Sequence, residues 1–580
     1  MKKHPTLLVI FALLVLPNLG WAQSNSSDLK PVTRTYALTG ATVVTQPGKV
    51  MEKTTIVIKD GLIQAIGKNV NIPFDAEIVK ADSMYIYAGF IEGLSHTGIP
   101  KAEPAQGRGG GGGGNRQQGP QVKDPGSPPN DLAGITPERL LTTVFDVKEK
   151  SIAGMRALGF TAAHVVPEGQ MLPGQAALMM LHGDNASQMV LQDKSALFAQ
   201  LTGARRVYPA TVIAVIAKWR EMYKQAELAK AHEKTYAASS KGMTRPNYDP
   251  ALQAFYPIID KTQSVFFKAS DVKSAYRVLS LQKEFGFDVV LAELKQGWHI
   301  ADELSKKNIP VLISMDLPSA KEEGKKDKKS KGKEEKAGKK NDPFKAEKAA
   351  LEKRRDEEMK KHFTQAATLE KAGVLFGFST LDVKSKDVRG NLRKMIENGL
   401  SENAALAALT TIPAKMLGVS DALGSVEQGK IANLVITDKP YFEEKSNVRY
   451  VFVDGHKYEY EVKKPAKKGD PTAKVKVAGK WSYNFEAMGQ NMEGILELVD
   501  NGGDISGTIT NEAMGSNSKI ESADLEGNTL SFSIDIDGGG QMVTVEYSLV
   551  FDGDSLEGTV SAGQFGTFDM EGERIPNPDK

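Results

Sequence analysis

The stretch Ala88-Gly-Phe-Ile-Glu-Gly-Leu-Ser-His96 decides how the rest of the chain is interpreted. An apolar run ends here in a glycine-bounded turn that carries a single histidine. Because side chains alternate between the two faces of a strand, positions 94 and 96 are expected on the same face. Two histidines at this spacing would form a chelating pair for a divalent metal inside a barrel. Position 94 is leucine, so only His96 of such a pair is present.

Length and composition bound the class of protein. The 580 residues are enough for two or three domains, and 40% hydrophobic and 25% charged residues are ordinary values for a globular chain. The formal net charge of +2 creates no global field that would favour nucleic acid or an anionic membrane. The sequence has no cysteine, which excludes disulfides, thiol nucleophiles and thiolate metal sites.

Residues 1–22 have the pattern of a secretory signal peptide. Met1-Lys-Lys-His4 precedes the apolar run Leu7–Leu16, and Gly20-Trp-Ala22 places small residues at the −3 and −1 positions of a cleavage site. An uncleaved membrane anchor is the alternative, but the apolar run is short for a membrane span. We therefore expect an exported protein, periplasmic or secreted, with no membrane span after cleavage.

Two β-rich regions flank a long central region. Residues 36–82 contain short strand-like runs, with Lys59-Asp60-Gly61 as a hairpin turn, and residues 424–462 return to the same pattern. The region between them alternates helix-like and strand-like segments from Thr136 onward. Its strands are continuously apolar, which predicts a parallel sheet, closed or open, that is covered on both faces.

Particular elements of the central region can be placed. A helix is predicted at Pro137–Leu158, and residues 176–191 are predicted to form a hairpin around Gly183-Asp-Asn185. Further strands are expected at Val265–Ala269, Asp288–Glu293, Pro310–Met315 and Val374–Phe378.

Two compositionally biased segments interrupt this pattern. Gly109–Gly114 is a homopolymeric run without the strand–turn–helix context of phosphate-binding loops, so a flexible insertion is predicted at 105–130. A Lys/Glu/Gly tract at 320–345 could contact nucleic acid, but its interspersed acidic residues favour a solvated insertion in a barrel loop. No nucleic-acid partner is therefore expected.

The end of the chain has a pattern of its own. A basic, Pro-containing linker is predicted at 463–474, and residues 475–577 contain strand-like runs separated by Asn-Gly, Gly-Asn and Asp-Gly pairs. This spacing predicts an independent antiparallel β-barrel or sandwich. Such a domain could hold a small apolar ligand or could be a packed accessory domain.

Four groups of segments resemble the metal-dependent amidohydrolase superfamily, in its imidazolonepropionase-like branch. They are Ile58–Gly67; Ala88–Glu92 with Ser95-His96; Gly159-Phe-Thr161 with Val165–Pro167 and Pro173–Ala176; and Ala407–Gly418 with Gly424–Val435. The resemblance implies an α/β protein with a distorted (β/α)₈ TIM-like barrel at 88–422 and a composite β-sandwich domain from 31–87 and 423–462. The C-terminal β domain is then an appended unit.

The resemblance also implies a chemistry. In the family, one or two divalent metals such as Zn²⁺ lie at the C-terminal ends of the barrel strands, held by a His-x-His pair, further histidines, sometimes a carboxylated lysine, and an aspartate after the last strand. The metal lowers the pKa of its bound water, and the aspartate takes and returns the proton. The substrates implied are carbon–nitrogen bonds in cyclic amides or dipeptide-like molecules.

A comparison of individual positions shows that most of the family's metal ligands and its catalytic aspartate are replaced in this sequence. Leu94 stands at the first histidine of the pair, and Leu381 stands at the catalytic aspartate. His96 and Glu293 are candidate metal ligands. Asp382 is a candidate catalytic residue one position late, and only a bulge or the loop itself could bring its side chain back to the site. Because catalytic Zn²⁺ normally has three protein ligands, we expect the metal to be absent or weakly bound.

Two functions remain open at this stage. A pseudoenzyme, acting as a binding or partner subunit beside an active homologue or another protein, is favoured because leucine cannot ligate a metal and because fold does not imply function. A genuine hydrolase with a reduced or rearranged metal site is the alternative. Lys268, at a strand end, is either a buried reactive amine or a solvated lysine, and Glu92 is expected to be structural.

Overall fold

The computed structural model consists of two compact units, residues 1–462 and 463–580, which are described separately. It describes residues 35–100, 124–318, 345–461, 470, 473, 475–487, 490–511, 516–537, 542–562 and 566–576. The predicted signal peptide and most of the two predicted insertions and the linker lie outside the described residues. Among the described residues, no helix has the length and apolarity needed to cross a membrane.

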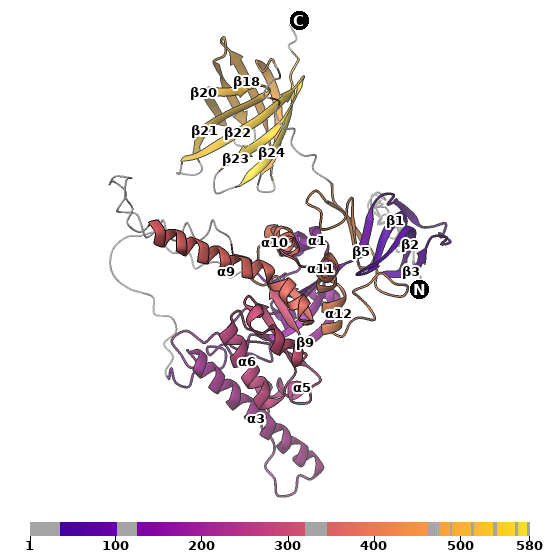
Figure 1. Ribbon diagram of the computed structural model, residues 1–580, viewed down its shortest axis with the longest axis vertical. Helices are drawn as coiled ribbons and strands as arrows, with labels where there is room; N and C mark the ends of the chain where they lie inside the picture. The colour runs from indigo at the N-terminus through magenta and orange to yellow at the C-terminus, as the bar shows by residue number, and fades with distance from the viewer. Residues whose placement is uncertain are drawn as a thin grey trace, which may run out of the picture. The chain divides into compact units, whose positions relative to one another are not determined.

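One mixed sheet of eight strands is built from both flanks of the barrel sequence (Figure 1). Its strands are β1 (Thr35–Gln46), β2 (Lys49–Lys59), β3 (Leu62–Gly67), β4 (Glu77–Lys80), β5 (Tyr85–Ala88), β14 (Leu434–Thr437), β15 (Val448–Val453) and β16 (His456–Glu459). The order is β16-β15-β14-β5-β1-β2-β3, with β4 beside β1. Strand β14 pairs antiparallel with β5, so the two flanks of the chain meet directly before the barrel begins.

Local sequence explains the hairpin between β2 and β3. Asp60 and Gly61 both have positive φ, +51° and +80°, as a two-residue type I′ turn requires. The turn places Lys59 opposite Leu62, as the sequence predicts. The apolar side chains of this sheet gather in a core of their own, which includes Leu38, Ile86, Leu434 and Phe452.

Eight further strands close into a barrel. They are β6 (Phe90–Ser95), β7 (Phe160–Val165), β8 (Gly174–Met180), β9 (Val190–Gln200), β10 (Ser264–Lys268), β11 (Val289–Leu294), β12 (Val311–Ser314) and β13 (Phe376–Ser379). Their order is β10-β11-β12-β13-β6-β7-β8-β9. All neighbours are parallel except β8, which runs antiparallel to β7 and β9 and forms the predicted hairpin. The predicted distorted eight-stranded barrel is therefore confirmed.

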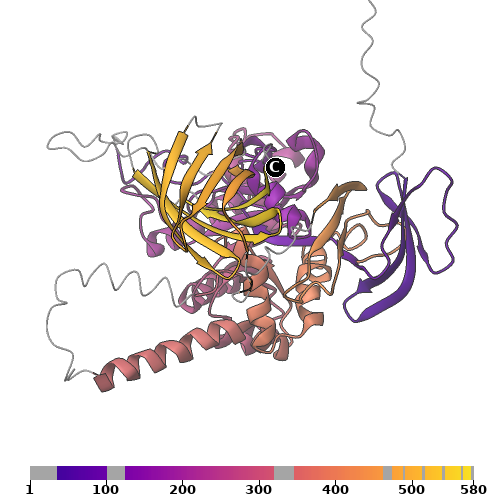
Figure 2. The ribbon, with the colours of Figure 1, turned by 90° about the horizontal axis from the view of Figure 1, so that it is seen from above.

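Helices lie between the barrel strands along the chain, and three more follow the last barrel strand. The α-helices are α1 (Lys150–Ala157), α2 (Ala186–Met189), α3 (Val212–Ala238), α4 (Pro250–Gln253), α5 (Tyr256–Ile259), α6 (Val272–Phe285), α7 (Ala301–Lys306), α9 (Lys345–Lys371), α10 (Ser385–Glu397), α11 (Glu402–Leu409) and α12 (Thr411–Met416). Two short 3₁₀ turns are η2 (Leu141–Thr143) and η3 (Gly297–His299). Helix α6 shows the usual signals, because Asp271 caps its start and Gly286, at φ +72°, ends it. Figure 2 shows α9 running outward from the barrel.

The predicted helix at Pro137–Leu158 is wrong over its first half. Only η2 and α1 form within this range. Backbone carbonyl groups that a helix would use internally are bonded elsewhere: Gln175 donates from its side chain to the Pro137 oxygen and from its backbone to the Arg139 oxygen. Glu149 then caps a new helix start by accepting from the Ser151 amide.

The second unit is a closed antiparallel barrel of eight strands in sequence order (Figure 1). The strands are β17 (Gly479–Ala487), β18 (Gln490–Asp500), β19 (Ile505–Asn511), β20 (Ser516–Glu526), β21 (Thr529–Asp537), β22 (Met542–Asp552), β23 (Ser555–Ser561) and β24 (Thr567–Arg574). Strand β17 pairs with β24 to close it. Its core contains the fully buried Trp481, whose ring lies 4.1 Å from the Arg574 guanidinium carbon. Of the two predicted arrangements, barrel or sandwich, the barrel is the one that forms.

Candidate functional site at the barrel mouth

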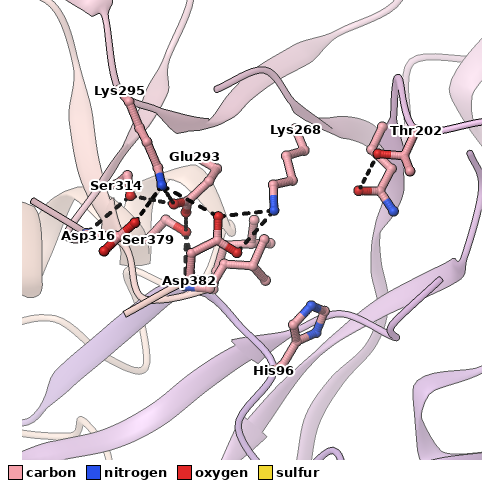
Figure 3. Close-up of polar contacts among 12 residues, drawn as sticks. His96, Thr202, Lys268, Glu293, Lys295, Ser314, Asp316, Ser379 and Asp382 are labelled. Carbon is pink, nitrogen blue, oxygen red and sulfur yellow. Dashed lines mark hydrogen bonds and ion pairs between the residues drawn. The ribbon is translucent and has the colours of Figure 1, made fainter. Parts of the chain in front are cut away.

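Polar side chains from several strands meet at the C-terminal ends of the parallel barrel strands (Figure 3). Lys268, Ser314 and Ser379 are the last residues of β10, β12 and β13, and Glu293 is the penultimate residue of β11. The turns that follow β11, β12 and β13 add Lys295, Asp316 and Asp382. Because parallel strands end at one rim, residues that are far apart in sequence form one cluster, which we call the mouth network.

Glu293 is the buried centre of the mouth network. Its side chain is fully buried and its backbone lies in the left-handed region at φ +58°, which is rare for a non-glycine residue. Its two carboxylate oxygens accept hydrogen bonds from the hydroxyl groups of Ser314 and Ser379. Burial, together with the charge of Asp382, raises the pKa of Glu293 to about 7.

Lys295 lies between three carboxylates that come from three different strand ends. Its Nζ is 2.7 Å from Asp316 Oδ2, 3.7 Å from Asp382 Oδ2 and 3.9 Å from Glu293 Oε1. Burial alone would lower the pKa of Lys295, but the hydrogen bond to Asp316 and the three carboxylate charges raise it above its ordinary value. The ammonium group therefore stays charged.

Asp382 reaches the mouth from a turn, not from a strand. Strand β13 ends at Ser379, so the alternation of side chains along a strand no longer applies at Asp382, three residues later. Lys268 Nζ lies 3.1 Å from Asp382 Oδ1 and 3.2 Å from Oδ2. Both carboxylate oxygens of Asp382 therefore face ammonium groups. Lys268 is neither isolated nor fully solvated, because its side chain is 23% exposed and ion-paired.

His96 lies on the other side of the mouth in Figure 3. Its Nδ1 is 2.8 Å from the carbonyl oxygen of Val166. A carbonyl oxygen only accepts, so Nδ1 carries the proton and Nε2 of the neutral ring keeps its lone pair. Burial lowers the pKa of His96, which favours this neutral form. The imidazole is thus in the tautomer that a metal ligand needs.

The two leucines of the altered motif add only hydrocarbon. Leu94 is fully buried in the large core of the first unit, and Leu381 is partly buried against the same core. Strand β6 meets β13 through the pair Leu94–Ser379, so Leu94 and the segment that contains Leu381 lie at the same seam of the barrel. The two leucines therefore contribute apolar packing at this seam.

The buried carboxylate of Glu92 links strand β6 to the segment that follows β13. Its carboxylate accepts from Ser95 Oγ at 3.1 Å, from Thr97 Oγ1 at 2.7 Å and from Thr380 Oγ1 at 2.6 Å. The bond to Thr380 ties the first barrel strand to the segment that follows β13. Burial raises the pKa of Glu92 to about 7, although the three hydroxyl bonds oppose that rise.

His164 is buried in strand β7 and is satisfied by its neighbours. Its Nδ1 is 3.0 Å from the Gly93 carbonyl oxygen, its Nε2 is 2.8 Å from Ser195 Oγ, and its ring packs edge-on against Phe266. Burial lowers the pKa of His164 to about 4, so the ring is neutral near pH 7. A base this weak is poorly matched to activating the serine hydroxyl, and these contacts are those of a structural histidine.

Sequence reasoning selected His96, Glu293 and Asp382 but missed Lys295 and Asp316. The available signal was the repeat of polar residues two positions apart at the ends of apolar strands, as in Glu293 and Lys295. A search for metal ligands passes over lysine because an ammonium group cannot donate a lone pair. The structure brings Glu293, Asp382 and Lys295 into one network, with His96 on the facing wall (Figure 3).

The side chains present do not fit a catalytic zinc site. Such a site needs three protein ligands and an open position. Within the part of the chain that the structure describes, no group of three or more His, Asp or Glu side chains is arranged to hold a metal ion. His96 is a single imidazole, while Glu293 and Asp382 are already engaged by hydroxyl and ammonium groups.

The architecture is an eight-stranded, mostly parallel barrel that carries a composite sheet, with its polar cluster at the C-terminal rim of the parallel strands. Residues 280–457 match the sequence model of the amidohydrolase family. An amidohydrolase from Thermotoga maritima MSB8 has a similar solved structure, with 21% identity and a TM-score of 0.56, over 73% of this chain and 100% of that one.

Molinate hydrolase is also similar, with 12% identity and a TM-score of 0.41, over 73% of this chain and 95% of that one. A comparison with curated proteins found no match. The family model thus matches one part of the chain, residues 280–457, and the similarity to the Thermotoga maritima structure shows a shared fold. The imidazolonepropionase-like branch stays a prediction.

Proposed function

We propose that this chain is an exported amidohydrolase-fold protein that works as a binding or partner subunit and not as a metal-dependent hydrolase. The observation that carries the proposal is the mouth network itself. Where the family motif supplies metal ligands, Leu94 and Leu381 supply hydrocarbon, and the remaining carboxylates face the ammonium groups of Lys268 and Lys295. Its binding partner would be a protein of the same fold or another exported protein.

The chemistry of the family explains why these replacements matter. Hydrolysis by that route needs a water of lowered pKa and a carboxylate that is free to accept its proton. Asp382 is the carboxylate nearest the expected position, and both of its oxygens lie within 3.2 Å of the Lys268 ammonium. His96, a single imidazole, lies across the mouth from this network in Figure 3.

One observation favours the second candidate, a hydrolase of carbon–nitrogen bonds with a rearranged metal site. The hydrogen bond from His96 Nδ1 to Val166 leaves Nε2 with a lone pair, as in histidines that ligate metals. Glu293 at the facing strand end would be its partner. For that site to form, the Glu293 carboxylate would have to give up its hydrogen bonds to the serine hydroxyl groups and its contact with Lys295. A metal ion would then take their place.

An activity assay separates the two candidates. The full chain would be tested against cyclic amides and dipeptides with and without added Zn²⁺ or Mn²⁺. The proposal expects no metal-dependent turnover from the wild type. Turnover that appears with metal, and that His96→Ala and Glu293→Gln each abolish, would overturn it in favour of the hydrolase. Circular dichroism of both variants would check that each remains folded.

A further inference from the structure

We infer that Lys295 is a tethered cation, an ammonium group built into the chain that takes the electrostatic place of a metal ion in the barrel mouth. This inference rests on the proposed function and says how the mouth is kept free of divalent ions. It assigns a role to a residue that the sequence resemblance does not mark.

Geometry is the first support. The Lys295 ammonium lies within 4 Å of carboxylates from the ends of β11, β12 and β13, namely Glu293, Asp316 and Asp382. A centre of positive charge that gathers carboxylates from several strand ends is the arrangement that a bound cation creates. Here the charge arrives on a side chain whose backbone is only two residues from Glu293, so no ion has to be taken up from solution.

Burial is the second support. Glu293 is fully buried, whereas the side chains of Asp316 and Asp382 are 45% and 37% exposed. Carboxylates that share a site repel one another, and the repulsion is strongest where water is excluded. The ammonium group offsets that repulsion at the buried end of the cluster. Lys268 adds a second positive charge at Asp382.

The same charges keep free divalent ions out. A hard cation prefers carboxylate oxygens, and the mouth network offers several. To bind there, the ion must displace the Lys295 ammonium or lie beside it and be repelled. Removal of this one charge, with the chain volume retained, would leave three carboxylates without their shared cation. The variant Lys295→Met therefore uncovers an oxygen-lined site that the wild type closes.

The test compares the full-length wild type with Lys295→Met and Lys295→Arg, with Mn²⁺ as the probe, in calorimetric titrations and in thermal unfolding. Lys295→Met should bind Mn²⁺ at least about tenfold more tightly than the wild type, which corresponds to about 1.4 kcal/mol. Lys295→Arg keeps the charge and should behave as the wild type. Adding Asp316→Asn to Lys295→Met should remove the gain.

Two outcomes overturn the inference. One is a folded Lys295→Met protein whose Mn²⁺ affinity equals that of the wild type. The other is failure of both Lys295→Met and Lys295→Gln to fold with and without Mn²⁺, while Lys295→Arg folds, because an ion then cannot replace the ammonium group. Folding that is recovered only with Mn²⁺ supports the inference. A wild type that itself carries metal overturns the proposed function, so the two failures are distinguishable.

Discussion

Lys268 and Asp382, 114 positions apart in the sequence, form an ion pair across the barrel rim with 3.1 Å between Nζ and Oδ1. The pair joins the end of β10 to the turn after β13, and Lys295 approaches the same carboxylate from β11. Asp382, the candidate catalytic residue that lies one position after the family's aspartate position, is therefore paired with two positive charges.

The energy of this pair can be measured with a double-mutant cycle. Lys268→Met, Asp382→Asn and the double variant would be unfolded in urea. Because the two side chains are 23% and 37% exposed, we expect a coupling energy of roughly 1 kcal/mol, between the values for exposed and buried pairs. A coupling energy near zero would mean that solvent screens the pair and that Lys295 alone compensates Asp382.

Introducing the two ligands that the family resemblance implies should create metal affinity. The double variant Leu94→His, Leu381→Asp supplies an imidazole beside His96, whose Nε2 lone pair is available, and a carboxylate at the family position. We expect its Zn²⁺ affinity to exceed that of the wild type by at least about tenfold, because it brings the protein ligand count to three. Calorimetric titration measures the gain, with the double variant Leu94→Met, Leu381→Met as the matched control. No gain would show that the pocket itself has been remodelled.

Glu92 should make stability depend on pH. Its pKa in the folded protein is raised to about 7 from an ordinary value of 4.5, so the folded state binds the proton more tightly than the unfolded state does. The stabilisation is full below about pH 4.5 and is lost as pH rises through about 7, at up to about 1.4 kcal/mol per pH unit.

The variant Glu92→Gln isolates this contribution. It removes the titrating charge and keeps a side chain of the same shape, so its free energy of unfolding should fall less between pH 5 and 8 than that of the wild type. Urea unfolding at both pH values measures the difference. Equal slopes for the two proteins would contradict the raised pKa of Glu92.

The C-terminal barrel should unfold independently of the first unit. Trp481 is fully buried in its core and stacks beneath Arg574, so Trp481→Ala should destabilise this unit by about 3–5 kcal/mol. Differential scanning calorimetry of the full chain should show one transition moved to lower temperature and one unchanged. Movement of both transitions together would mean that the two units are energetically coupled.

Strands β10 to β13 could be predicted from the sequence because each is a short, mainly apolar run, and they lie close to where those runs predict them. The region 137–149 could not, because its helical pattern is overridden by hydrogen bonds to Gln175, which is distant in sequence. Helix propensity depends on the local sequence alone and does not account for such tertiary partners.

The residues of the candidate site also fall into those that could be predicted from the sequence and those that could not. Leu94, His96 and Leu381 are visible in motifs, and Glu293 is visible as a charge at the end of an apolar strand. The role of Lys295 depends on three carboxylates brought together by the closure of the barrel, and Asp382 depends on a turn that removes it from strand alternation. The partners of both residues are set by the fold, so the local sequence pattern does not show them.

The metal content of the purified wild-type chain tests the central claim most directly. Protein produced in medium that contains zinc, manganese and iron would be analysed by elemental mass spectrometry, beside the Leu94→His, Leu381→Asp variant prepared in the same way. Because the mouth carboxylates are held by Lys268 and Lys295, the account predicts well below one metal ion per wild-type chain. One tightly held ion per wild-type chain, lost when His96 or Glu293 is replaced, would contradict it.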